Sequence, residues 1–393
     1  MSSPSLRNPR MSPRLKMDVM GRIVLGLLCA GVACAQSILD PARIPDSFKR
    51  FAVAPDSTPL RCNASYIHPV LNFSFRFQAG YTVRVPMDQY LGPGHTWVVF
   101  ERITPEGEPD KAVYVGDKFL LPDVPKTRVE LRVVGGYLLG EGRYQVEWMM
   151  LDDLGRVALK HWTLVAARTY ANRNVKIAMA PGTVAEFSLR GAGGPRAADG
   201  AAAIRLTVLL EAAPMAWRRF RLRASDQIML LGGLSSLLER VPTKSVRLVV
   251  FNLDQQKELY RNTSFSLNNL DQVGQVLNQT ELNRVDYHIL QRPLGHLDFL
   301  ADLMNREVRE PEPSDVVLVL GPRSRYTDKI PSRALEKAEG PPRFLYLQYQ
   351  PFLRAQAESP DTIWLAVKTM RGKTLVIRTP SDFAKGIEQV ERK

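Results

Sequence analysis

The sequence predicts two domains: an all-β sandwich over residues 59–190, followed by an α/β domain with a doubly wound, mostly parallel sheet over residues 204–393. Apolar and polar residues alternate in the first half, which is typical of strands with one buried face. Apolar runs alternate with helical segments in the second half, which is typical of a parallel sheet covered on both faces. Residues 191–203, rich in Gly and Ala, read as a flexible linker between them.

Seven or eight short strands are predicted in the first half, between about Leu60 and Val165. The alternation is clear at Leu71–Phe77 and again at Val129–Val133. Asp152–Gly155 reads as a hairpin turn between the last two strands. Just before it, Gly142–Val146 resembles the tyrosine corner of immunoglobulin-like domains. We therefore expect an immunoglobulin-like sandwich, preceded by a lead segment at residues 36–58.

Residues 1–35 are predicted to be a secretory signal peptide. A basic region precedes the apolar stretch Ile23–Ala35, which ends in small residues before Gln36. That stretch is shorter than the roughly 20 apolar residues of a membrane-spanning helix, so we expect cleavage and a secreted or periplasmic chain with no transmembrane segment. Cys62 is the one cysteine after the signal and has no partner for an internal disulfide, which favours a bacterial envelope protein.

Composition and motifs argue against several function classes. The net charge of +13 is moderate and spread along the chain, so no nucleic-acid partner is expected. No Gly-x-Ser-x-Gly nucleophile elbow occurs, and the five histidines show no metal-ligand spacing. We therefore predict no catalytic residues, no cofactor and no enzymatic activity.

The second half carries a regular series of predicted elements. Strands are expected at Ile204–Leu210, Val246–Leu253, Glu258–Thr263, Val285–Leu290, Val316–Leu320, Phe344–Tyr349 and Thr374–Ile377. Helices are expected at Ser225–Val241, Leu270–Leu282, Leu294–Val308, Pro360–Met370 and from Ser381 onward. Ser359 followed by Pro360 reads as the cap and first residue of one helix.

The order of these elements resembles the von Willebrand factor A family, in the form found in secreted bacterial proteins. Three strand sequences carry the resemblance: Thr207–Glu211, Arg247–Asn252 and Val316–Gly321. It covers roughly residues 204–393.

The family's metal-ion-dependent adhesion site needs an Asp-x-Ser-x-Ser motif after the first strand, because Mg²⁺ demands hard oxygen ligands. Here that position reads Glu211–Met215, in which Glu211 is the one residual metal candidate and both hydroxyls are missing. The resemblance therefore implies a degenerate member without a metal.

Basic residues follow the strands where the family would place acids. Arg218 and Arg219 come after the first strand, and Arg323 and Arg325 come after the fourth. Because ligands of open α/β sheets bind beyond the carboxyl ends of the strands, these four arginines form a candidate ligand-binding group, which we call the arginine rim. Guanidinium groups suit carboxylates and phosphates. The alternative is a solvated face, which is what charged runs usually form.

These observations favour a secreted, non-enzymatic binding or scaffold protein that acts through protein or surface contact in the cell envelope. Two alternatives stay open. One is a hydrolase or transferase whose site is assembled from scattered loops, and the other is a module that binds an anionic polymer through the arginine rim.

Overall fold

The computed structural model describes residues 37–49, 51, 57–188, 203–216, 219, 221–280, 289, 291–336, 340–351 and 360–392. The predicted signal peptide and almost all of the predicted linker lie outside these residues, as does nearly all of the strand expected at Val285–Leu290. None of the described helices is both long and apolar enough to cross a membrane. The predicted domain boundaries stay predictions.

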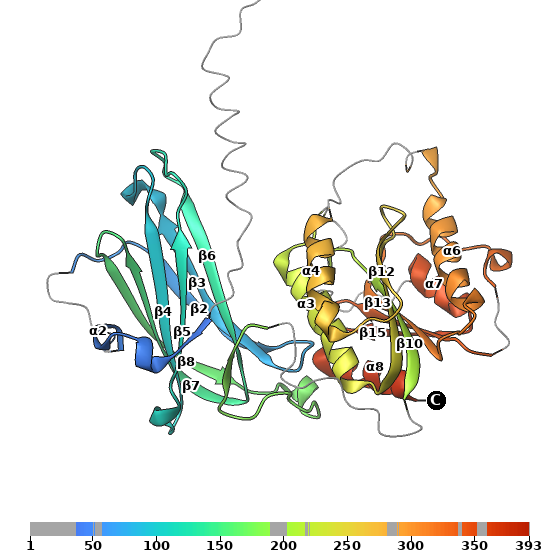
Figure 1. Ribbon diagram of the computed structural model, residues 1–393, viewed down its shortest axis with the longest axis horizontal. Helices are drawn as coiled ribbons and strands as arrows, with labels where there is room; N and C mark the ends of the chain where they lie inside the picture. The colour runs from blue at the N-terminus through green and yellow to red at the C-terminus, as the bar shows by residue number, and fades with distance from the viewer. Residues whose placement is uncertain are drawn as a thin grey trace, which may run out of the picture. The chain divides into compact units, whose positions relative to one another are not determined.

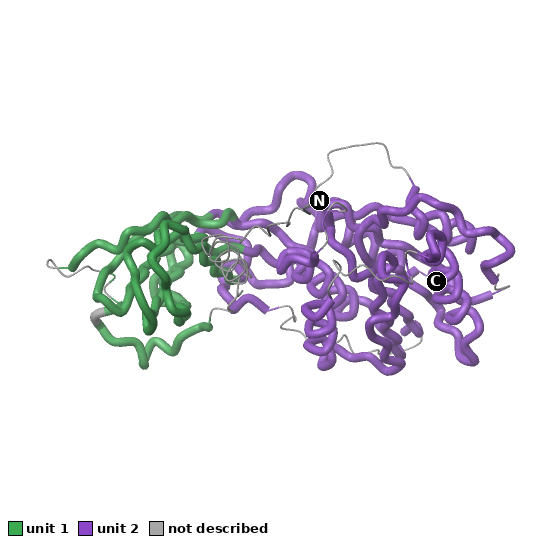
Figure 2. Tube along the Cα trace, turned by 90° about the horizontal axis from the view of Figure 1, so that it is seen from above, with its two compact units in different colours: residues 1–68, 79–137, 144–164 green, residues 69–78, 138–143, 165–393 purple. Residues whose placement is uncertain are grey.

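The chain divides into two compact units (Figure 2). The first comprises residues up to 68 together with 79–137 and 144–164. Its five-stranded sheet has the order β1-β5-β4-β7-β8 (Figure 1). A four-stranded sheet has the order β2-β3-β6-β9, of which β9 falls in the second unit. The strands are β1 (Ser37–Leu39), β2 (Asn63–Leu71), β3 (Phe77–Pro86), β4 (Thr96–Pro105), β5 (Val113–Leu120), β6 (Glu130–Leu139), β7 (Gly142–Asp152), β8 (Val157–Ala166) and β9 (Val184–Glu186).

The first unit has an aromatic core between its strands. Trp97 of β4 and Trp148 of β7 are fully buried, together with Tyr81 of β3. These residues alternate with more exposed ones along each strand, as the period-two pattern predicts. The turn predicted at Asp152–Gly155 is confirmed, because β7 ends and β8 begins there.

The alternation at Leu71–Phe77 was wrongly interpreted as one strand. The structure has a tight turn between β2 and β3, in which the Asn72 side chain accepts the N–H groups of Ser74 (3.0 Å) and Arg76 (3.2 Å). Phe73 and Phe75 are buried because the turn belongs to the second unit, where both rings pack against Phe383 at 5.4 and 5.8 Å between centroids.

The second unit contains a six-stranded sheet of order β12-β11-β10-β13-β14-β15. Strand β12 is antiparallel to β11, and the other neighbours are parallel. The strands are β10 (Ile204–Glu211), β11 (Thr243–Asn252), β12 (Lys257–Asn262), β13 (Val316–Pro322), β14 (Arg343–Tyr349) and β15 (Lys373–Ile377). The longer helices are α3 (Ala224–Arg240), α4 (Leu270–Gln279), α6 (Gly295–Arg309), α7 (Thr362–Thr369) and α8 (Pro380–Glu391).

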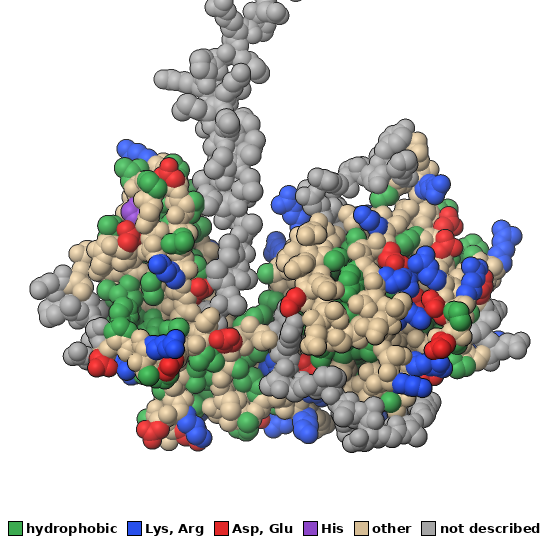
Figure 3. Space-filling model, viewed as in Figure 1, with side chains coloured by type: hydrophobic (Ala, Val, Ile, Leu, Met, Phe, Trp, Pro, Cys, Tyr) green, Lys and Arg blue, Asp and Glu red, His purple; other side chains and the backbone are tan. Residues whose placement is uncertain are grey.

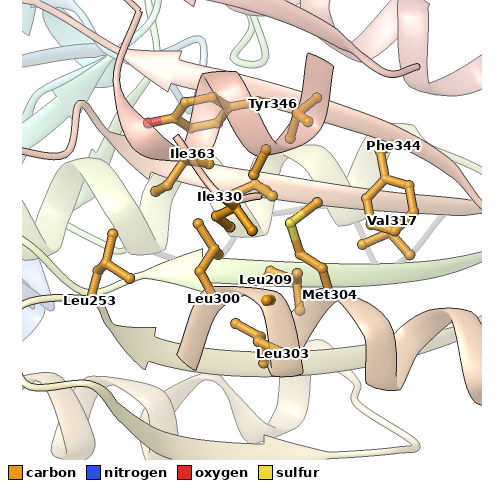
Figure 4. Packing of buried hydrophobic residues seen from close by; sticks show 14 of the residues in the cluster. Leu209, Leu253, Leu300, Leu303, Met304, Val317, Ile330, Phe344, Tyr346 and Ile363 are labelled. Atoms are coloured by element: carbon orange, nitrogen blue, oxygen red, sulfur yellow. The ribbon is translucent and has the colours of Figure 1, made fainter. Parts of the chain in front are cut away.

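Apolar side chains of α6 and α7 pack on one face of this sheet. Leu300 and Met304 of α6 and Ile363 of α7 share a buried cluster with Val317 and Tyr346 of the strands (Figure 4). The cluster holds the carboxyl ends of β10 and β13 and the start of α6 in place, and those ends carry the candidate site.

The fold class predicted from the sequence is wrong. An immunoglobulin-like sandwich followed by a doubly wound α/β domain does not describe this chain, whose described residues are mostly β: fifteen strands in three sheets, with five helices of eight residues or more. The C-terminal sheet contains parallel strands but makes no clear doubly wound domain. Its compact unit also takes in residues 69–78 and 138–143 of the N-terminal strands. Local sequence patterns predict single strands and helices. They leave open which of these segments associate in one sheet or one compact unit.

Candidate functional site

The candidate site lies at the carboxyl edge of the parallel sheet. Strands β10 and β13 are parallel neighbours, so the loops that follow them leave the sheet at the same edge. Glu211 ends β10 and is buried, and Gly321 of β13 passes so close that a Cβ there would lie 2.7 Å from the Glu211 Cβ. Glycine at position 321 therefore permits this approach of the two strands.

The Glu211 carboxyl is buried and incompletely paired. The Leu253 N–H donates to Oε1 (3.1 Å), whereas Oε2 has no hydrogen-bond partner in the described part of the chain. Burial raises the pKa of Glu211 well above its usual value, and the nearby charges of Asp254 and Asp361 raise that pKa further, while the Leu253 N–H opposes the shift. The folded protein thus favours a neutral carboxyl at this position.

We expect Glu211→Gln to stabilise the protein at neutral and alkaline pH. A raised pKa means that the folded state binds the proton more tightly than the unfolded state, so the unfolding free energy of the wild type falls as pH rises from the ordinary carboxyl pKa to the folded one. The amide removes this slope, so the variant should be more stable than the wild type above that window. Denaturant unfolding at a series of pH values measures the difference.

Glu312 is exposed and serves as the matched control. Glu312→Gln should leave the pH dependence of the unfolding free energy as in the wild type. If the Glu211→Gln and wild-type curves run parallel at every pH, Glu211 carries its charge in the folded protein and this interpretation is wrong.

Asp361 joins three elements at the same edge. It is fully buried and caps α7, where its Oδ1 accepts the Trp364 N–H (2.8 Å). Its Oδ2 accepts the Ser324 N–H (2.7 Å) and the Gln348 side-chain amide (3.0 Å). Burial raises the pKa of Asp361, and these hydrogen bonds oppose the shift. The carboxyl therefore ties the loop after β13 to β14 and to the start of α7.

Charges of opposite sign meet beside these carboxyls. The Arg325 Nε lies 2.8 Å from Asp254 Oδ1, and the guanidinium also lies over the Tyr326 ring at 5.2 Å. Tyr326 stacks on buried His296 with 3.9 Å between ring centroids, and His296 Nε2 lies 3.3 Å from Asp328 Oδ2. Burial raises the pKa of Asp254, and the charges of Arg325 and His296 oppose that rise. The chain's own cations thus compensate carboxylates at this edge.

The predicted arginine rim is described in part. Arg218 lies outside the described residues, as do Trp217 and Phe220. Arg219 Nη1 lies 4.0 Å from Asp226, a buried residue near the start of α3. Arg323 is half-buried and Arg325 is exposed, both on the loop after β13. The arginine rim as a ligand-binding group stays a prediction.

Sequence reasoning missed Asp254, Tyr326 and Asp361. The cap of the helix was placed at Ser359, which lies outside the described residues, whereas Asp361 occupies the N-cap position of α7. An Asp directly before an apolar helical run is an available capping signal. The His296–Tyr326 stack had no signal in the sequence, because it joins a helix start to a distant loop.

The described residues contain no group of three or more His, Cys, Asp or Glu side chains that could hold a metal ion. Glu211, the residual metal candidate, faces Asp254 and Asp361 as electrostatic neighbours and meets the Leu253 backbone instead of a set of open ligands.

Comparisons with known proteins do not assign this chain to a family. No protein-family model and no curated protein matches the chain. Among solved structures, the ApaA protein of Bordetella pertussis is 17% identical over 29% of this chain and 99% of its own, with a TM-score of 0.20. The structural-genomics target SoR45 is 15% identical over 28% of this chain and 88% of its own, also with a TM-score of 0.20. Scores this low carry no argument, and nothing in these matches bears on a von Willebrand factor A domain.

Proposed function

We propose that the protein is an exported, non-enzymatic binding or scaffold protein that acts through contact with a protein or surface of the cell envelope. One observation carries the proposal: two carboxylates at the carboxyl edge of the sheet are engaged inside the protein, Asp361 by backbone and side-chain donors and Asp254 by Arg325. Groups held in this way position loops, and their oxygens are occupied by donors of the chain itself. The arginines of the same edge are the groups through which we propose that the protein contacts a partner.

The chemistry of the arginine rim suits an anionic group on that partner. Arg323 and Arg325 flank Ser324, whose backbone N–H is fixed by Asp361. A guanidinium group binds carboxylates or phosphates through paired hydrogen bonds. Because Arg325 already pairs with Asp254, an incoming anion would share this guanidinium or displace the carboxylate.

We expect the purified chain to bind polyanions and to lose that binding in an Arg218→Glu, Arg323→Glu double variant. Charge reversal replaces attraction by repulsion, and the binding should also weaken with salt, since the screening length is only about 8 Å at physiological ionic strength. Titration of a polyanion panel at low and high salt measures both effects.

A Lys368→Glu, Lys385→Glu double variant is the matched control, because it makes the same change in net charge at exposed positions of α7 and α8. It should bind as the wild type does. Equal loss in both double variants would reduce the effect to net charge and remove the arginine rim from the proposal.

Export is tested separately. Residues 1–35 should be absent from the chain recovered outside the cytoplasm, because the apolar stretch Ile23–Ala35 is expected to be cleaved after its small residues. N-terminal sequencing of the exported chain should begin at or close to Gln36. A chain that stays in the cytoplasm with its first residues intact would contradict an envelope function.

A further inference from the structure

The three connections at one end of the first unit form a single ordered surface, which we call the loop end. They are residues 87–95, 121–129 and 153–156, taken together with Asp152 at the end of β7. Backbone N–H groups donate across them from Gly92 to Val124 (2.9 Å), from Leu121 to His95 (2.9 Å) and from Asp153 to Thr96 (3.1 Å). These bonds tie the connections to one another and to the start of β4, so side chains on the loop end are held where they are.

Large hydrophobic side chains are concentrated on and beside the loop end. Leu91, Leu120 and Leu154 are 70%, 76% and 57% exposed, and Val129 is 39% exposed. These four are among ten exposed large hydrophobics in the described part of the chain. Leu120 pairs with Thr96, and the N–H of Asp153, the residue before Leu154, donates to Thr96 from the other side. Two strand spacings, about 10 Å, therefore separate Leu120 from Asp153. This gathering of exposed apolar side chains makes the loop end a candidate contact surface.

Carboxylates on the loop end are mostly neutralised from within. Asp88 pairs with Arg61 (2.8 Å), Asp152 with Arg156 (2.6 Å) and Asp153 with His95 (3.0 Å). His95 is held by Asp153 and by the Leu91 carbonyl, and these hydrogen bonds raise its pKa although desolvation opposes them.

Unlike these carboxylates, the basic side chains beside the leucines have no ion-pair partner in the described residues. Lys118, Lys126 and Arg128 are exposed, and none of them forms an ion pair within the described residues. Asp123 and Glu130 are exposed carboxylates nearby that are likewise without an ion pair in the described residues, so three basic and two acidic side chains leave one positive charge in excess. Figure 3 shows hydrophobic side chains with basic and acidic ones beside them at the upper end of this unit, where these connections lie in Figure 1.

We propose that the loop end docks on the surface of an anionic lipid bilayer, with Leu91, Leu120 and Leu154 inserted among the acyl chains and Lys118, Lys126 and Arg128 against the headgroups. Aliphatic side chains on separate loops suit a soft apolar phase, which closes around each of them, and basic residues beside them are attracted to anionic lipid. The inference rests on the surface contact of the proposed function, but uses a surface separate from the arginine rim.

The test is co-sedimentation of the exported, N-terminally sequenced chain with vesicles of phosphatidylcholine and phosphatidylglycerol, and with vesicles of phosphatidylcholine alone. We expect binding to the mixed vesicles that is weaker on phosphatidylcholine alone and falls with salt. A Leu91→Ser, Leu120→Ser, Leu154→Ser variant should bind the mixed vesicles at least about tenfold more weakly than the wild type does. The side chains are exposed, so this variant should melt as the wild type does.

A Val70→Ser, Tyr170→Ser, Leu294→Ser variant is the matched control, because it removes three exposed hydrophobics elsewhere. It should bind vesicles like the wild type. The polyanion titration of Arg218→Glu, Arg323→Glu in the absence of vesicles reports separately on the proposed function. Equal vesicle binding by wild type and leucine variant would overturn the inference, and so would no binding by the wild type. Leucine-dependent self-association without vesicles would assign the loop end to a second copy of the chain.

Discussion

Replacing Glu307 by Ala should cause one of the largest losses of stability in this protein. The Glu307 side chain is fully buried in α6, and its two oxygens accept Nη1 of Arg247 (2.9 Å) and Nη1 of Arg261 (2.9 Å) from β11 and β12. Arginine stays protonated in proteins, so without Glu307 the two largely buried guanidinium groups would keep their charge and lose a partner for it. Removing one partner of a buried ion pair costs about 3–5 kcal/mol.

The size of this effect separates Glu307 from its neighbours in the same network. Glu310 also pairs with Arg247 (3.2 Å), but its side chain is a quarter exposed. Glu310→Ala should therefore cost about 1 kcal/mol or less. Denaturant unfolding of both variants measures the contrast. Similar losses for the two would mean that Arg247 and Arg261 are satisfied by solvent and the remaining carboxylates, which would contradict a central role for Glu307.

Local elements of the second half were predicted well, because buried apolar runs and helical stripes are properties of short segments. Helix α3 was expected at Ser225–Val241 and spans Ala224–Arg240, and β13 was expected at Val316–Leu320 and spans Val316–Pro322. The errors in the prediction concern which segments pack against one another in the folded chain. Phe73 and Phe75 alternate like strand residues, yet they lie in a turn that packs on Phe383, and no local pattern carries that information.

The same limit applies to the candidate site. Glu211 and the arginines after β13 were found from their positions at strand ends, which a sequence shows. Their partners were not found, because Asp254 pairs with Arg325 and Asp361 reaches Ser324 only once the chain is folded. The sequence therefore indicated a basic edge, whereas the structure has arginines compensated by carboxylates, and binding there depends on how these pairs are held.

Asp361→Asn tests that dependence and should affect both stability and binding. The two Asp361 oxygens accept hydrogen bonds from Trp364 on one side and from Ser324 and Gln348 on the other. The Asn side chain has one oxygen and one NH₂ group. Its NH₂ group must therefore face either the Trp364 N–H or the donors of Ser324 and Gln348, which leaves hydrogen-bond donors facing each other in a buried position. Leaving buried groups unpaired costs about 1–3 kcal/mol, and loss of a helix cap costs about 1 kcal/mol, so we expect about 2–4 kcal/mol in denaturant unfolding.

The binding effect follows from Ser324, which lies between Arg323 and Arg325. Once its N–H loses the Asp361 acceptor, the backbone between the two arginines is no longer fixed, and a two-arginine contact with an anion should weaken because ordering the loop now opposes binding. Asp361→Asn should therefore bind polyanions more weakly under conditions where it is still folded. Asp298→Asn, at an exposed position of α6, is the control and should change neither property. Lower stability of Asp361→Asn with unchanged polyanion binding would mean that the loop after β13 does not carry the contact, and the arginine rim would then be a solvated face.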